Sequence, residues 1–253
     1  MTYTVDAVAK ALELLFLVAQ EPNLGVTELA KRSGNTKARA FRLLGTLEQS
    51  GLVRRKEPLA TYSLGYKALF IGAAAQEQVS VTQVAKARLP EIGMKLNESV
   101  LVRVRDGLES ACVAWWDAPH AIRIHSQLGE RRPLYAGSSG KLLLAYAPSD
   151  IQEEVLRQER PQFTANTPSK RAQLEKEIEK VLKQGYSYSA GERTPDTVSV
   201  AAPIRDASGT VIASLAMTSP SSRVPVERLP EYAKALIEAA DQFSVELGYM
   251  KAV

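Results

Sequence analysis

The sequence predicts an α+β fold with an N-terminal winged helix-turn-helix, a linker helix, and a C-terminal domain whose antiparallel sheet is flanked by helices. Three observations predict it. Residues 1–65 carry three short helical patterns followed by a basic hairpin, residues 66–79 are one apolar helical stretch, and residues 80–253 mix strands of period two with amphipathic helices. We therefore expect two domains and a linker with those boundaries.

The helices of the first domain follow from hydrophobic spacing and from capping residues. Apolar side chains recur at a helical period over residues 5–19, and the run ends at Pro22-Asn23-Leu24-Gly25. Thr27 is the expected N-cap of a second, short helix. Asn35 is the expected N-cap of a third helix, which Gly51 ends.

The third helix has an apolar side and a basic side, which predicts that it reads DNA. Leu43, Leu44 and Leu47 fall on the side that packs inward. Strands at residues 52–56 and 61–64 then form a basic hairpin, the wing. The major groove admits one helix, in which Arg reads guanine edges while Lys and Arg hold phosphates. The expected DNA-binding residues are Thr36, Lys37, Ala38, Arg39, Phe41 and Arg42 of the helix, and Arg54, Arg55 and Lys56 of the hairpin.

The charge distribution also favours a polyanionic partner. Residues 1–67 contain 10 Lys and Arg against 6 Asp and Glu, whereas the whole chain contains 32 against 28. The rest of the chain is therefore neutral, and the net charge of +4 belongs to the first part. Double-stranded DNA is the first candidate partner, and a merely solvated basic face is the alternative.

The linker helix predicts self-association. Residues 66–78 carry small apolar side chains on nearly all sides. Because an exposed apolar helix is unfavourable, we expect it to pack against a second copy, giving a homodimer at minimum.

The second domain is expected to form a small-ligand cup. Asp106-Gly107 between two alternating segments is a strong hairpin signal, and Gly/Ser-rich loops lie at the mouth of the sheet. The expected strands are Ser99–Arg105, Leu108–Trp116, Ala121–Gln127, Thr197–Ile204 and Thr210–Thr218. The expected helices are 81–96, Ser139–Tyr146, Ser149–Gln158, Ser169–Gln184 and about Val226–Leu247.

Composition and motifs argue against several other classes. With Cys112 as the single cysteine, no intrachain disulfide can form, which fits a reducing cytoplasm. Neither a membrane span nor a signal peptide is visible. Gly137-Ser-Ser-Gly-Lys141 has neither phosphate-loop nor nucleophile-elbow spacing. His120 and His125 lack a third zinc ligand, and we expect His125 to be structural or cup-lining rather than part of a triad. We expect no catalytic residue, metal or cofactor.

Blocks of sequence in both domains resemble one known family. They are Val26–Gly34, Arg42–Glu48, Ser50–Val53, Pro133–Ala145, Gly185-Tyr186, Val200–Asp206 with Gly209, and Ser219–Arg223. Over nearly its whole length the chain resembles the IclR family of bacterial transcriptional regulators. The resemblance implies a winged-helix DNA-binding domain, a linker helix, a GAF-like effector-binding domain, and a dimer or dimer of dimers. The sequence departs from the family's pattern at Ala38, Arg39, Tyr135 and Ser199.

The resemblance also implies ligand-binding positions. They are Ile122, Ile124, Ser138, Ser139, Ser189, Ser199, Ala216 and Thr218. The residues themselves agree in character, because Ser138-Ser139-Gly140 opens a helix whose N–H groups and positive dipole end can receive a carboxylate. Hydroxyls on the strands can donate or accept hydrogen bonds, although each could instead be satisfied within its own strand.

Two function classes remain. The first is a DNA-binding regulator, by resemblance a repressor of a catabolic operon, whose operator binding is modulated by a small organic acid. The second is a GAF-type sensor whose winged helix binds protein rather than DNA. The clustered basic residues favour the first.

Overall fold

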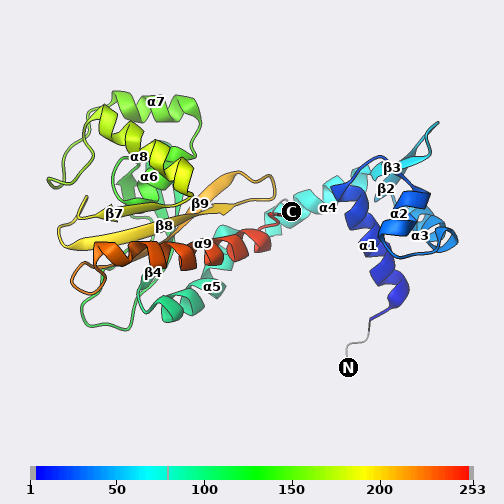
Figure 1. Cartoon of the computed structure of the whole chain (residues 1–253), viewed down its shortest axis with the longest axis horizontal. Coiled ribbons are helices and arrows are strands. Elements are labelled where there is room, and N and C mark those ends of the chain that lie inside the picture. The colour runs from blue at the N-terminus through cyan, green and yellow to red at the C-terminus, as the bar shows by residue number, and fades with distance from the viewer. Residues whose placement is uncertain (1–3, 79, 251–253) are drawn as a thin grey trace. The chain divides into compact units, whose positions relative to one another are not determined.

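The computed structural model describes residues 4–78 and 80–250, and the chain divides into two compact units, Met1–Gln78 and Val79–Val253 (Figure 1). The linker helix belongs to the first unit by its contacts. The predicted α+β class is correct.

The first unit is a winged helix-turn-helix. Three helices pack around one apolar core, and a three-stranded antiparallel sheet in the order β1-β3-β2 completes it. The elements are α1 (Asp6–Gln20), β1 (Leu24–Gly25), α2 (Val26–Arg32), α3 (Lys37–Gln49), β2 (Val53–Lys56) and β3 (Thr61–Leu64). Leu14 of α1, Leu29 of α2 and Leu44 of α3 are fully buried in this core, so the apolar side of α3 packs inward as predicted.

Both predicted helix caps lie one or two residues from the true ones. Thr36, not Asn35, is the N-cap of α3, because its hydroxyl accepts the backbone N–H of Arg39 at 3.2 Å. Asn35 instead donates from its side-chain amide to the Ser33 hydroxyl at 2.9 Å. The N-cap of α2 is Gly25 and Thr27 lies inside the helix, because the short strand β1 leads directly into α2.

The linker helix α4 spans Tyr66–Gln78, and residue 79, the last of the predicted linker, lies outside the described residues. Its large apolar side chains are exposed: Tyr66, Leu69, Phe70 and Ile71 each keep more than half of their accessible surface. A further group of exposed apolar residues on α1 includes Val8, Leu12 and Phe16.

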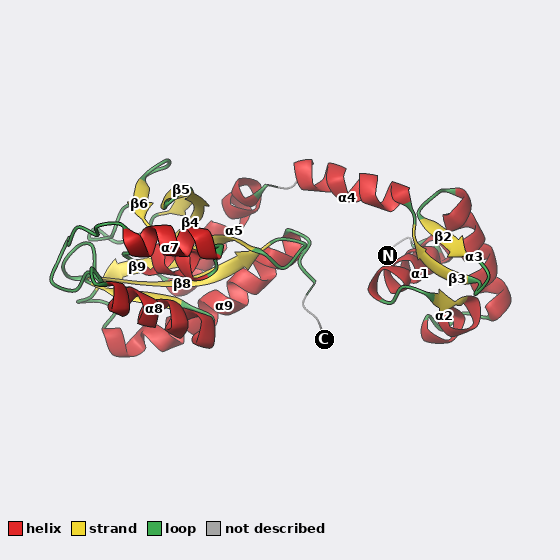
Figure 2. Cartoon of the chain, turned by 90° about the horizontal axis from the view of Figure 1, so that it is seen from above, coloured by secondary structure: helices red, strands yellow, loops and turns green. Residues whose placement is uncertain are grey.

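The second unit is a six-stranded antiparallel sheet with helices on both faces (Figures 1 and 2). The strand order is β6-β5-β4-β9-β8-β7. The strands are β4 (Ser99–Asp106), β5 (Glu109–Trp116), β6 (Arg131–Pro133), β7 (Ser187–Ala190), β8 (Thr197–Arg205) and β9 (Val211–Pro220). The helices are α5 (Val81–Leu96), α6 (Ser138–Ala145), α7 (Ser149–Arg157), α8 (Arg171–Gln184) and α9 (Leu229–Glu246), the last preceded by a 3₁₀ turn at Val226–Arg228.

Side chains alternate between the two faces along each strand, and each face of the sheet carries its own apolar core. Val198, Val200 and Ala202 of β8 pack in the core with α5 and α9. Ala201 of β8 and Ala216 of β9 lie on the opposite face, in the core that contains α6 and α8. Because side chains alternate with a period of two, Ser199, Arg103 and Thr218 also belong to this second face.

The predicted strand Ala121–Gln127 is wrong. This segment is an irregular loop, and the edge of β5 is occupied by later residues. β6 pairs with Glu109–Ala111, and the hydrogen bonds of Cys112 to Gly129 and Glu130 extend the pairing. Residues 121–127 pair with no strand of the described chain, so their alternating pattern does not produce a strand.

In the described part of the chain, no helix has the length and apolar character that crossing a membrane requires.

Candidate functional site

The basic residues of α3 and the wing lie on the surface of the first unit. Thr36, Lys37, Ala38, Phe41 and Arg42 are exposed, and Arg39 is half-buried. The three basic residues of β2 are exposed as well: Arg54, Arg55 and Lys56. Every residue that the sequence predicts to touch DNA is therefore accessible to a partner.

Several of these side chains already have polar partners. Arg39 donates to the carboxylate of Asp6 on α1, and this hydrogen bond holds the pKa of Asp6 below its ordinary value. Lys56 donates to the side chain of Asn23 at 2.9 Å. In the described residues, the side chains of Lys37 and Arg42 form no hydrogen bond or ion pair. Those two cations are therefore available to a partner without loss of an internal contact.

A pocket lies on the α6 face of the sheet of the second unit, and strand register explains its lining. Ser189 of β7 is paired with Ser199 of β8, which is in turn paired with Thr218 of β9. On one face this places three hydroxyls in a row across neighbouring strands. Leu101 of β4 and Ala216 of β9 form the next row. All five residues line the pocket, whose unoccupied space is about 670 Å³ including its open mouth.

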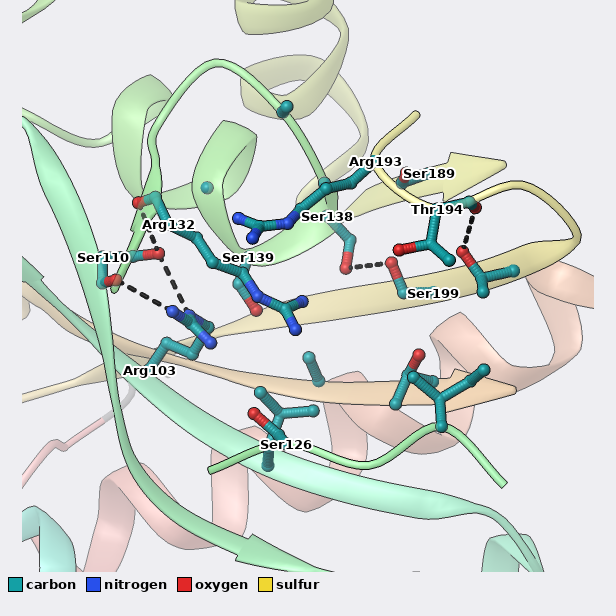
Figure 3. Close-up of a pocket in the computed structure, with 18 of the residues that line it drawn as sticks. Arg103, Ser110, Ser126, Arg132, Ser138, Ser139, Ser189, Arg193, Thr194 and Ser199 are labelled. Carbon is teal, nitrogen blue, oxygen red and sulfur yellow. Dashed lines mark hydrogen bonds between the residues drawn. The ribbon is translucent and has the colours of Figure 1, made fainter. Parts of the chain in front are cut away.

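The N-terminus of α6 forms one side of the pocket (Figure 3). Ser138 donates from its hydroxyl to that of Ser199 at 2.8 Å. Gly137 adopts a φ of 84°, which favours glycine. A Cβ on Gly140 would lie 2.7 Å from the backbone oxygen of Pro133, so the helix begins against the chain that enters it.

A network of ion pairs lies beside the N-terminus of α6. Glu192 accepts the backbone N–H of Gly137 at 2.9 Å and forms an ion pair of 2.6 Å with the ammonium of Lys141. Lys141 is 1% exposed and also donates to Glu177 at 2.5 Å. The N-terminus of α6 therefore already has an internal carboxylate beside it.

Of the predicted ligand residues, all but one lie together. Ile124, Ser138, Ser139, Ser189, Ser199, Ala216 and Thr218 line the pocket. The exception is Ile122, which does not line it and is 74% exposed. Since the loop replaces the predicted strand, Ile122 and Ile124 no longer share one strand face, and only Ile124 reaches the pocket.

Three arginines of the pocket escaped the sequence analysis. Arg103 of β4, Arg132 of β6 and Arg193 from the loop after β7 extend their guanidinium groups toward the same space (Figure 3). A partial signal is present, because Arg103 interrupts the apolar run from Val100 to Val104. Nothing in the local sequence indicates that the three side chains meet.

His125 lines the pocket but is not part of a catalytic triad. Its Nδ1 lies 3.2 Å from the carboxylate of Asp117. Among the described residues, no serine hydroxyl is hydrogen-bonded to His125, whose side chain is 57% exposed. No group of three or more His, Cys, Asp or Glu in that part of the chain could hold a metal ion.

Comparison with known families agrees with the geometry of both units. Residues 7–57 match the model of the IclR helix-turn-helix domain, and residues 73–245 match the model of the bacterial transcriptional regulator IclR C-terminal domain. The chain belongs to the IclR family. It is therefore a DNA-binding transcriptional regulator, and not an enzyme.

Individual relatives extend over nearly the whole chain. The HTH-type transcriptional regulator KdgR of Escherichia coli (strain K12) is 30% identical over 97% of this chain and 94% of its own length. The transcriptional repressor IclR of the same organism is 25% identical over 99% and 93%. The crystal structure of a protein described as an IclR transcriptional regulator, from Silicibacter sp. TM1040, superposes with a TM-score of 0.88 over 98% of both chains at 24% identity. This last likeness shows the IclR fold.

Proposed function

We propose that this IclR-family chain represses a neighbouring catabolic operon by binding a specific operator through α3 and the wing, and that a small organic acid in the pocket changes that binding. The observation that carries the DNA part is the set of exposed cations on α3 and β2, of which Lys37 and Arg42 have no side-chain partner among the residues that the structure describes. A relative named as a repressor supports the sign of regulation. We infer that the chain acts in the cytoplasm, with the chromosome.

The docking proposal assigns separate roles to the helix and the wing. α3 enters the major groove, where Arg39 and Arg42 contact base edges and Lys37 contacts a phosphate. Arg54, Arg55 and Lys56 of the wing contact the backbone or the adjacent minor groove. Thr36, Ala38 and Phe41 lie on the same exposed side and contact the groove wall.

The effector proposal rests on the pocket. It combines a row of hydroxyls with guanidinium groups, which suits a small acid with further polar groups. The acid must favour one arrangement of the DNA-binding units in order to act. A typical coupling of about 1–3 kcal/mol would change operator affinity roughly 5- to 150-fold, and DNA would change effector affinity by the same factor.

A gel shift with the region upstream of the neighbouring operon tests the DNA part. We expect a discrete complex that survives excess unrelated duplex, and a markedly weaker complex when Arg42 is changed to alanine. An Arg157→Ala variant, which removes an exposed arginine of the second unit, is the matched control. Absence of any complex with wild type would favour the alternative, in which the winged helix binds protein.

A further inference from the structure

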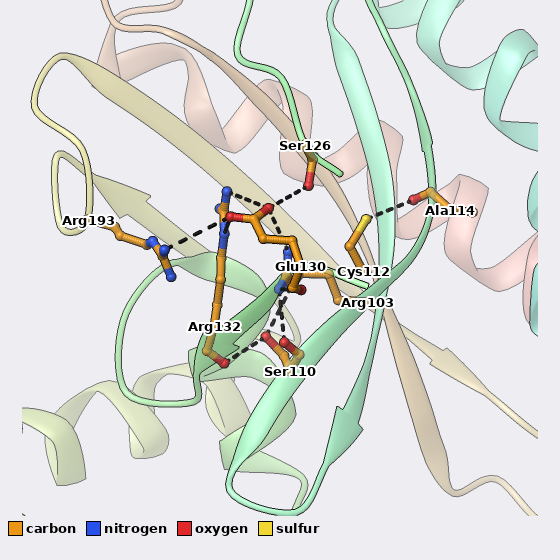
Figure 4. Close-up of polar contacts among 8 residues, drawn as sticks. All are labelled: Arg103, Ser110, Cys112, Ala114, Ser126, Glu130, Arg132 and Arg193. Carbon is orange, nitrogen blue, oxygen red and sulfur yellow. Dashed lines mark hydrogen bonds and ion pairs between the residues drawn. The ribbon is translucent and has the colours of Figure 1, made fainter. Parts of the chain in front are cut away.

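The strongest unexplained feature of the molecule is a cluster of three arginines around one acid, which we name the arginine cluster: Arg103, Arg132 and Arg193 around Glu130 (Figure 4). Arg132 holds the Glu130 carboxylate with two hydrogen bonds of 2.9 and 3.0 Å. Ser126 donates a third hydrogen bond to the same carboxylate at 3.0 Å. Glu130 is therefore committed mainly to Arg132.

The other two guanidinium groups are held less well by this acid. Arg193 approaches Glu130 only to 4.0 Å and stacks at 5.3 Å from the ring of Phe163. Arg103 is 1% exposed, and its Nε and Nη2 donate to Ser110 and to the Glu130 backbone oxygen. Its Nη1 is buried, 3.7 Å from the Glu130 carboxylate, and has no hydrogen-bond partner among the described residues.

A buried, unpartnered guanidinium N–H is costly, because no hydrogen bond offsets the loss of its hydration. Three positive groups face one carboxylate, so the cluster carries a surplus of positive charge. Burial, followed by repulsion from Arg132, lowers the pKa of Arg103 to about 10. The same two causes, in the same order, lower the pKa of Arg193. An anion bound between the arginines would raise the pKa of Arg103 and of Arg193, because its negative charge stabilises the protonated guanidinium groups.

Other charged groups nearby do not neutralise the cluster. Asp117 is engaged by His125 at 3.2 Å and by Arg123 at 3.6 Å. At the α6 side, Glu177 and Glu192 both pair with the buried ammonium of Lys141, and Glu177 also acts electrostatically on Lys180. The pocket is therefore positive at the arginine cluster, whereas the N-terminus of α6 already has the carboxylate of Glu192 beside it.

We propose that the acidic group of the effector binds between Arg103, Arg132 and Arg193, and that its uncharged polar end faces Ser138 and Ser199. The proposal rests on the proposed function of an acid-binding pocket. It revises the expectation that the N-terminus of α6 receives the carboxylate, since Glu192 already lies there and would repel a second one. The guanidinium fork geometry suits a carboxylate. The surplus of two positive charges favours a ligand with two carboxylates over one with a single carboxylate.

Calorimetry on the full chain, without DNA, tests the site with three probes: malonate, acetate and the neutral analogue malonamide. Wild type is expected to bind malonate more tightly than acetate, and malonamide least. Arg193→Gln is the principal variant, because Arg193 makes no hydrogen bond that the fold depends on in the described structure. It should lose affinity for malonate by about tenfold or more. Arg132→Gln should lose at least as much.

Arg131→Gln is the matched control. Arg131 is the neighbour of Arg132 in β6, yet it is 55% exposed and pairs with Asp106 and Glu109 outside the pocket. Circular dichroism confirms that each variant is folded. The proposal is overturned if Arg193→Gln and Arg132→Gln bind malonate as tightly as wild type and Arg131→Gln, or if wild type prefers malonamide or binds no probe.

The two proposals fail in different ways. The calorimetry contains no DNA, so a lost anion site leaves the operator gel shift unchanged. Conversely, malonate binding that depends on Arg193 while no operator complex forms would contradict the proposed function and leave the anion site intact.

Discussion

Arg39 is a DNA-binding candidate that is occupied in the unbound chain. It lies in the first turn of α3 and pairs with the exposed carboxylate of Asp6 on α1. The hydrogen bond from Arg39, and then its charge, lower the pKa of Asp6, so this acid is ionised at neutral pH. To contact a base or a phosphate, Arg39 must exchange one anionic partner for another.

We therefore expect Asp6→Asn to raise operator affinity severalfold, because Arg39 no longer leaves an ion pair on docking. Fluorescence anisotropy with a labelled operator duplex measures the change. Glu13→Gln is the control, since it removes the same charge from the same helix but from a pair with Lys10. Equal gains in both variants would show that only net charge changed.

Lys141 is a second residue whose role follows from its partners. Its ammonium is buried between Glu177 and Glu192. Removing one member of a buried ionic group leaves an uncompensated charge, so Lys141→Met should lower the free energy of unfolding by roughly 3–5 kcal/mol. Urea denaturation measures this loss. Adding Glu192→Gln should restore part of it, whereas Lys176→Met, at an exposed position of α8, should cost little. A fully stable Lys141→Met variant would contradict the account.

For single residues, the sequence predicts the environment correctly where neighbouring positions in the same helix or strand determine it. Leu44 and Arg42 fall on opposite sides of α3 because helical spacing alone decides it. The prediction fails for Arg103 and Arg193, which are distant in the chain and are brought together only by the sheet. Arginine is usually exposed, so even the position of Arg103 within an apolar run does not indicate that it meets Arg193.

At the scale of elements, α5 shows how one residue fixes the packing of a helix on the sheet. Gly93 of α5 lies against the indole of Trp116 on β5, and a Cβ there would come within 2.1 Å of the ring. The approach of α5 to β5 therefore requires glycine, although the backbone of Gly93 is helical and would itself accept alanine.

Gly93→Ala should therefore destabilise the second unit by roughly 1–3 kcal/mol through overpacking. Gly45→Ala, in α3 with open space around it, should instead stabilise the first unit by up to about 1 kcal/mol. Thermal unfolding of the two variants provides the comparison. A Gly93→Ala variant as stable as wild type would contradict the close packing of α5 against Trp116.

Most elements were predictable because their signals are local. α4 and α5 lie at the predicted positions, and Gly185 ends α8 in the left-handed conformation. The expected strand Ala121–Gln127 shows the limit of this approach. Its alternation is genuine, but a strand also needs a partner, and Glu109–Cys112 at the edge of β5 are paired with the chain around Gly129 and β6 instead. Competition for a sheet edge is a property of the whole fold.

At the scale of the whole molecule, the exposed apolar side chains of α4 are unusual for a chain that remains single. Leu69, Phe70 and Ile71 are each more than 60% exposed on consecutive positions. Contiguous apolar surface of this kind marks an interaction site. Two copies would also read two half-sites, which increases the specificity of a single winged helix.

We expect a homodimer or a dimer of dimers at micromolar concentration. Light scattering should give at least twice the mass of the chain, and Leu69→Glu/Phe70→Glu should shift the population toward monomer. Leu182→Glu on α8, another exposed apolar position, is the control and should leave the mass unchanged. A wild-type monomer would contradict the assignment of α4 as a self-association surface.

The most direct test of the central claim is the affinity of the full chain for its operator duplex, measured by fluorescence anisotropy over a range of salt concentrations. The account predicts that Arg42→Ala costs roughly 1–3 kcal/mol of specific binding, because a contact to a base edge is lost. Arg54→Ala and Arg55→Ala should each weaken binding to all duplexes alike and reduce the salt slope by about 1. Unchanged affinity and unchanged salt slope in all three variants would contradict DNA recognition by α3 and the wing.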